Sequence, residues 1–146
     1  MKYIIKRWET PISDGKKIFF HSSSFRQDLE RHTEDLIIYI KDEETKLMCE
    51  FIFKAPGAFL FVRESLCTPK VGYDKNIGLT KLIENSDMTS LLNPDIVILT
   101  YWNHLKNKTI FSNYFIASLY SCIEVITDEP PEINQYTMEE YEKLKR

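Results

Sequence analysis

The chain has 146 residues, of which 43% are hydrophobic and 13% aromatic, and its formal net charge is −3. This length and apolar content suit a single compact domain over residues 1–146 and argue against extended disorder. The slightly acidic balance argues against a nucleic-acid-binding protein, because neutralising phosphates requires a basic face.

The first quarter of the chain predicts two strands and a short helix. The apolar runs at residues 3–5 and 17–21 have the length of strands. Ser24 and Gln27 have the spacing of a capping box, in which a serine oxygen accepts a hydrogen bond from a free backbone N–H. Because Phe25, Leu29 and His32 follow at helical spacing, we expect a helix there.

Three apolar runs then follow closely, at residues 36–40, 47–53 and 59–62. They are rich in aromatic and β-branched residues, which favour strands. A charged segment at residues 41–44 and an Ala-Pro-Gly turn at residues 55–57 separate them. This pattern predicts an antiparallel meander over about residues 35–64.

The second half of the chain is harder to assign. The continuous apolar run at residues 95–100 predicts a strand that is covered on both faces. Residues 109–122 fit a helix, because Phe111, Phe115, Leu119 and Cys122 share one helical face, but they also fit a strand. We prefer the helix, because no turn residue separates this segment from the apolar run at residues 123–127. A helix here makes residues 95–127 a βαβ crossover with parallel strands.

The tail predicts one more helix. Thr137 and Glu140 have capping-box spacing, and Met138, Tyr141 and Leu144 continue a helical pattern. Together the elements predict an α+β fold with a mixed, mainly antiparallel sheet and a few short helices.

The cysteines and the length of the apolar segments indicate where in the cell the protein is located. Cys49, Cys67 and Cys122 are too far apart for a zinc motif, and their odd number favours the reduced thiols of a cytosol. No apolar run is long enough to span a membrane, and the first one is too short for a signal peptide. We therefore expect a cytoplasmic protein with no membrane, metal or cofactor.

Candidate catalytic residues are few. The chain contains no P-loop, dinucleotide-binding, zinc-protease or nucleophile-elbow motif, which argues against an enzyme. An alternative function, as a small enzyme or ligand-binding protein, would use the carboxyl ends of parallel strands 95–100 and 123–127, where ligands gather. The residues predicted to line that pocket are Tyr101, Trp102, His104 and Asp128, although we prefer to explain His104 as a solvent-exposed residue beside a turn.

The acidic C-terminal part carries the main functional hypothesis. From Cys122 to Glu142 every charged side chain is acidic, and tyrosines lie among the acids. Such a surface suits a basic protein partner, because the acids would speed its approach and the tyrosines would anchor it in the complex. The alternative is that these acidic residues form only a solvated end of the domain. The predicted partner-binding residues are Asp128, Glu129, Glu132, Tyr136, Glu139 and Tyr141.

The sequence therefore favours a non-enzymatic protein-binding domain. Inhibitors and immunity proteins that neutralise a basic partner such as a toxin often combine this size with acidity and no catalytic motif, which is an analogy of class. A structural subunit of a homo-oligomer, sealed by aromatic residues such as Tyr114 and Tyr120, is a second alternative. The sequence predicts no oligomeric state.

Overall fold

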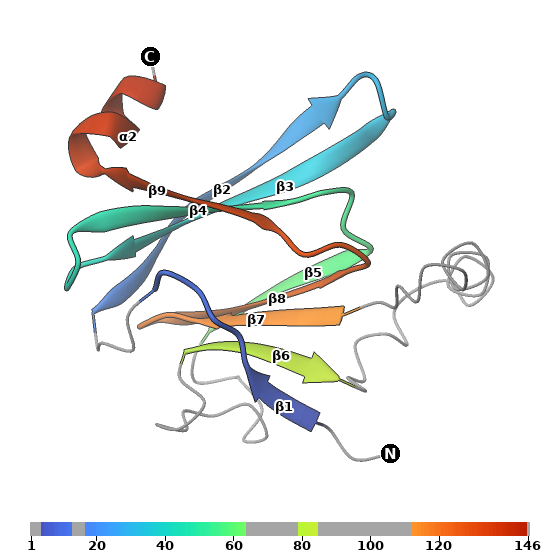
Figure 1. Cartoon of the computed structure of the whole chain (residues 1–146), viewed down its shortest axis with the longest axis horizontal. Helices are drawn as coiled ribbons and strands as arrows, with labels where there is room; N and C mark the ends of the chain where they lie inside the picture. Colours follow the sequence, from blue (N-terminus) through green and yellow to red (C-terminus); the bar gives the residue numbers. More distant parts are fainter. Residues whose placement is uncertain (1–3, 13–16, 64–78, 85–111, 146) are drawn as a thin grey trace.

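The computed structural model describes residues 4–12, 17–63, 79–84 and 112–145, which form two antiparallel β-sheets and one helix (Figure 1). The five-stranded sheet contains, in spatial order, β1 (Ile4–Arg7), β6 (Thr80–Glu84), β7 (Ser112–Ala117), β8 (Ser121–Thr127) and β5 (Ala58–Arg63). The four-stranded sheet contains β2 (Ile18–Asp28), β3 (Thr33–Asp42), β4 (Leu47–Phe53) and β9 (Glu132–Thr137), and the helix α2 (Met138–Leu144) follows β9. This helix is neither long nor apolar enough to cross a membrane.

The two sheets pack face to face around one core. Alternate residues of each strand point inward, as sheet geometry requires. The buried core residues of β3, β4, β7 and β8 are Leu36, Ile38, Ile40, Cys49, Phe51, Phe53, Tyr114, Ile116, Ile123 and Val125. The Trp8 ring joins the sheets, because its centroid lies 5.5 Å from that of Phe51 and 4.8 Å from that of Tyr114. The fold is a β-sandwich.

The predicted α+β class is therefore wrong, because the described residues are nearly all β. The predicted βαβ crossover over residues 95–127 is also wrong. Residues 112–117 and 121–127 form an antiparallel hairpin, β7–β8, in place of the preferred helix. The predicted strand at residues 95–100 lies outside the described residues.

Two features of β7 explain this error. The strand is buried on both faces: Tyr114 and Ile116 enter the core, while Phe115 packs with Ile83 and Cys122 on the other side. Its apolar residues therefore do not alternate with polar ones. The turn that ends it contains no glycine or proline, because the Ser118 hydroxyl donates to the Ser121 carbonyl oxygen at 2.8 Å instead.

The meander is only partly correct. β3 and β4 pair as expected, but β5 pairs with β8 in the other sheet. The predicted helix after Ser24 is wrong, because β2 continues to Asp28 and pairs with β3 up to its last residue. The ladder with β3 supplies hydrogen-bond partners along the whole of β2, and this long-range pairing outweighs the local capping signal. The strands expected near residues 3–5 and 17–21 are present as β1 and β2.

The tail helix is confirmed together with its capping box. The backbone N–H of Glu140 donates to the Thr137 hydroxyl, and the backbone N–H of Thr137 donates to Oε1 of Glu140, both at 3.1 Å. These bonds satisfy N–H groups that the first helical turn leaves free.

Three turns gather at one end of the sandwich, which we call the hairpin end: residues 29–32, 54–57 and 128–131. Arg31 reaches Glu129 across the first and third turns, with 3.3 Å between Nη2 and Oε1. The backbone N–H of Gly57 in the second turn donates to the carbonyl oxygen of Ile126 at 2.8 Å. The β2–β3 hairpin projects past the sheets at this end, whereas α2 lies at the other end (Figure 1).

Candidate functional site

The tip of the β2–β3 hairpin is held by its own residues. Oδ1 of Asp28 accepts hydrogen bonds from the backbone N–H groups of Glu30 and Arg31, both at 3.1 Å, which fixes the turn. His32 closes the turn with φ at 55°, in the left-handed region that non-glycine residues seldom occupy. The tip therefore presents its side chains on an ordered turn.

An apolar side chain surrounded by acids occupies this tip. Leu29 is 79% exposed, more than any other large hydrophobic residue in the described ranges. Asp28, Glu30 and Glu34 flank it along the hairpin, and Asp128 and Glu129 lie in the neighbouring turn. The hairpin end therefore combines an apolar projection with an acidic rim.

The ion pair that joins the two turns does little to neutralise this rim. Arg31 and Glu129 are 46% and 47% exposed, and exposed pairs of this kind contribute between nothing and about 1 kcal/mol. Glu34 is exposed. Negative charge therefore remains available around Leu29.

Two nearby cations are bound to a buried acid behind the rim. Asp35 is 1% exposed, and its carboxylate contacts Arg26 at 3.4 Å and Lys54 at 3.3 Å and accepts from the backbone N–H of Ala55 at 3.2 Å. Burial alone would raise the pKa of Asp35, but the bonds from Ala55, Lys54 and Arg26 hold this pKa below its ordinary value. These contacts fix the turn at residues 54–57 against β3.

The predicted partner-binding residues are divided between the two ends of β9. Asp128 and Glu129 lie at the hairpin end, and Glu132 begins β9 beside them. Glu139 and Tyr141 lie on α2, beyond the other end of the strand. They do not form the single strip that their positions in sequence indicated.

Tyr136, the remaining predicted residue, belongs to a hydrogen-bond network on the outer face of the four-stranded sheet. Glu50 is only 7% exposed. Its carboxylate accepts hydrogen bonds from Tyr39 at 2.5 Å, Asn134 at 2.9 Å and Tyr136 at 3.2 Å. Burial and the Glu50 charge raise the pKa of Tyr39 and of Tyr136. The Tyr136 hydroxyl therefore satisfies a buried carboxylate.

Tyr141 holds α2 against the sheet and is 3% exposed. Its ring centroid lies 5.1 Å from that of Tyr39 and 5.2 Å from that of His21, and its hydroxyl lies 3.3 Å from Nδ1 of His21. Burial lowers the pKa of His21, and the nearby charges of Lys145 and Lys41 lower it further. Tyr141 is therefore a packing residue, and it is too buried to serve as the anchor that the sequence predicted.

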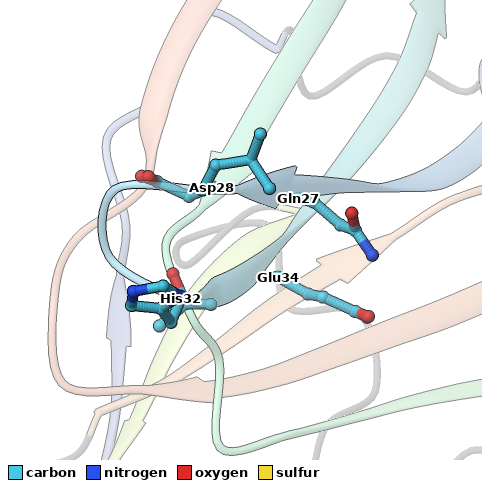
Figure 2. A pocket seen from close by; sticks show the side chains of 6 residues that line it. Gln27, Asp28, His32 and Glu34 are labelled. Carbon is cyan, nitrogen blue, oxygen red and sulfur yellow. The ribbon is translucent and has the colours of Figure 1, made fainter.

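An open depression lies along the hairpin behind its tip (Figure 2). Its volume is about 310 Å³, and the residues that line it are Gln27, Asp28, Leu29, His32, Thr33 and Glu34. Sequence reasoning missed this site, because it assigned the segment to a helix. The available signal was Leu29, a lone apolar residue among charged neighbours, which is typical of an exposed turn as well.

Among the described residues, no group of histidine, cysteine, aspartate and glutamate could hold a metal ion.

The alternative pocket loses its structural argument. Tyr101, Trp102 and His104 lie outside the described residues. Asp128 does follow β8, but β8 runs antiparallel to both of its neighbours, β5 and β7. The rule that ligands gather beyond the carboxyl ends of parallel strands therefore does not apply here.

The two described cysteines differ in state. Cys49 is a free, buried thiol, and burial raises its pKa to about 11, so it is unreactive at neutral pH. Cys122 is disulfide-bonded. The expectation of reduced thiols is therefore wrong for Cys122.

No protein-family model, curated protein or solved structure matches the chain. The geometry of the hairpin end is therefore the main guide to function.

Proposed function

We propose that the chain is a non-enzymatic protein-binding domain that holds a basic partner protein at the hairpin end. An inhibitor or immunity-type protein that neutralises a toxin is one form of this function. The observation that carries the proposal is Leu29, an apolar side chain 79% exposed at the tip of an acidic hairpin. Binding residues concentrate on turns that a rigid scaffold positions.

The chemistry of this end favours such a partner. Exposed carboxylates would attract a basic surface and speed encounter, while burial of Leu29 in an apolar pocket of the partner would stabilise the complex. Asp128 and Glu129 keep the role predicted for them, and Glu132 lies next to them. Glu139 and Tyr141 lie on α2 at the other end of the sandwich, and the Tyr136 hydroxyl donates to Glu50, so this proposal does not use these three residues.

Capture of the partner from the native host tests the proposal. The immobilised protein should retain a basic protein, and association should slow as salt screens the acidic rim. Leu29→Ser should weaken that binding about tenfold or more, as truncation of a central interface residue does. Leu144→Ser is the matched control, because Leu144 is also exposed, at 54%, but lies on α2. Equal binding by the two variants would overturn the proposal.

A second candidate is a homo-oligomer. Tyr114 is buried in the core and cannot seal an interface, but Tyr120 is 72% exposed. Phe25 of β2 and Phe59 of β5 are 55% and 39% exposed, and their rings lie 5.4 Å apart across the edges of the two sheets. Exposed aromatic pairs of this kind mark interaction surfaces. Measurement of the molecular mass in solution tests this candidate, because a protein that stays monomeric at high concentration is not a homo-oligomer.

A cytoplasmic location remains a prediction, and so does the small-enzyme alternative. The disulfide at Cys122 counts against the cytoplasm, because disulfides persist in oxidising compartments. Mass spectrometry of unreduced protein from the native host tests the location, since a cytoplasmic protein would yield Cys122 as a free thiol.

A further inference from the structure

A β-bulge in β2 places His21 on the outer face of the four-stranded sheet. Phe20 pairs with Ile40 and Ser22 pairs with Tyr39, so His21 is an extra residue between two register positions of β3. In such a bulge two residues oppose one, and the bulged strand is redirected locally. His21 and Ser22 therefore lie together opposite Tyr39, with 3.1 Å between Nδ1 of the imidazole and the serine hydroxyl.

The helix α2 docks on the sheet through a contact with this imidazole. Of the seven residues of α2, Tyr141 is the one that is buried. Its ring packs on the rings of His21 and Tyr39, with centroid distances of 5.2 Å and 5.1 Å. Its hydroxyl lies 3.3 Å from Nδ1 of His21, where a neutral imidazole can accept a hydrogen bond. A protonated imidazole carries a hydrogen on both nitrogens, so it cannot accept that bond.

The charges around His21 oppose a further positive charge. Partial burial lowers the pKa of His21, and the ammonium groups of Lys145 on α2 and Lys41 on β3 lower it further, whereas Glu142 on α2 raises it. Lys41 also contacts Glu43 at 2.9 Å, and Lys145 contacts Glu142 at 3.9 Å. The docked helix therefore favours the neutral imidazole.

We propose that protonation of His21 releases α2 from the four-stranded sheet, so that this helix is a pH-sensitive element. A proton favours the state that binds it more tightly, and the lowered pKa in the docked state makes this the undocked state. Docking is therefore complete well above 6.5, the ordinary pKa of histidine, and weakens as pH falls below that value. This proposal does not depend on the proposed function, because α2 and the hairpin end lie at opposite ends of the sandwich (Figure 1).

Hydrogen exchange in α2 tests the proposal. Between about pH 8 and about pH 5, where histidine becomes charged, the protection factors of α2 should fall. We expect a fall of about twofold to fivefold, the size of effect that exposed charges produce. His21→Asn should abolish this fall, because asparagine can accept a hydrogen bond from Tyr141 but does not titrate.

His32→Asn is the matched control for this experiment. His32 lies in a turn at the hairpin end, and asparagine tolerates its left-handed backbone. The protection of α2 should therefore fall in this variant as it does in the natural protein. If α2 keeps its protection at acid pH in the natural protein, or loses it equally in His21→Asn, the proposal is overturned.

The reverse coupling gives a second readout, because linkage between two equilibria is reciprocal. In an NMR titration, Tyr141→Ala should raise the titration midpoint of His21, and the amide signals of β3 show whether the sandwich stays folded. Lys145→Gln should also raise this midpoint. Lys143→Gln is its control on the same helix, because Lys143 is exposed and lies near Glu139. A midpoint that is the same in the natural protein, Tyr141→Ala and Lys145→Gln would exclude coupling between His21 and α2.

Discussion

The hydroxyl of Tyr39 on β3 donates a hydrogen bond to Oε2 of Glu50, its direct neighbour on β4. The pair lies on the outer face of the four-stranded sheet, where Glu50 also receives hydrogen bonds from two residues of β9. One buried carboxylate thus links three adjacent strands, and β9 is the strand that leads into α2.

Removal of the Tyr39 hydroxyl should destabilise the domain. We expect Tyr39→Phe to lower the free energy of unfolding by about 1.5–3 kcal/mol, the range for a hydrogen bond to a charged group. Urea denaturation measures this change. Tyr120→Phe is the control, because Tyr120 is exposed and its hydroxyl makes no hydrogen bond with a described residue. Equal midpoints for the two variants would contradict a structural role for the Glu50 network.

Replacement of Glu124 by glutamine should stabilise the domain. The Glu124 carboxylate accepts a hydrogen bond from Nδ2 of Asn113 at 3.0 Å, whereas Oδ1 of Asn113 is buried without a partner. A glutamine keeps the acceptor and adds an N–H for that oxygen, so we expect a gain of about 1 kcal/mol at neutral pH. Denaturation curves of Glu44→Gln, which changes an exposed acid, should match those of the natural protein.

The pH dependence of that gain follows from the titration of Glu124. Burial raises the pKa of Glu124 above its ordinary value of 4.5, although the Asn113 hydrogen bond opposes the rise. The folded state therefore binds the proton more tightly than the unfolded state, and ionisation destabilises it as pH rises above 4.5. The stability difference between Glu124→Gln and the natural protein should be smallest at acid pH and should grow toward neutrality. A difference that stays constant over this window would contradict the burial of this charge.

Loss of the capping box should loosen α2 while the sandwich stays folded. Thr137→Ala removes the hydroxyl that accepts the Glu140 backbone N–H, at a cost of about 1 kcal/mol. Hydrogen exchange should accelerate in α2 and remain slow in β3 and β4, because the core does not depend on the cap. Thr137→Ser retains the oxygen and should restore protection. Equal protection of α2 in the alanine and serine variants would show that the cap is unimportant.

The cysteines should differ in their reactivity toward a thiol reagent. Cys49 is buried with a raised pKa, so a thiol reagent should not modify it in the folded protein at neutral pH. After unfolding and reduction all three cysteines should react, whereas unfolding without a reductant should give fewer reactive thiols because Cys122 is disulfide-bonded. Three reactive thiols in the unreduced protein would exclude the disulfide.

Local signals in the sequence predicted local structure well and long-range pairing poorly. The Thr137 capping box and the β3–β4 hairpin are each encoded within a few neighbouring residues, and both are confirmed. The pairing of β5 with β8 joins residues that are far apart in sequence, from Ala58 with Ile126 to Arg63 with Ser121, and no pattern within either strand specifies its partner. The sandwich therefore could not be derived from periodicity alone.

Two errors in the predicted secondary structure arose because side-chain hydrogen bonds or strand pairing took the place of the expected local signals. The β7–β8 turn is stabilised by hydrogen bonds between Ser118 and Ser121 and has no glycine or proline, so the turn at Ser118 was missed. Ser24 and Gln27 have helix-capping spacing, but they lie on an edge strand. The acidic residues were identified correctly as types, but their division between the two ends of β9 depends on the strand itself, which the sequence analysis did not predict.

Two of the turns at the hairpin end also carry the chain from one sheet to the other. Residues 54–57 connect β4 to β5, and residues 128–131 connect β8 to β9. A partner protein that contacted both connections would hold the two sheets together and oppose their sliding past each other. Binding at this end should therefore raise the resistance of the whole domain to unfolding by heat and by force, including regions far from the point of contact.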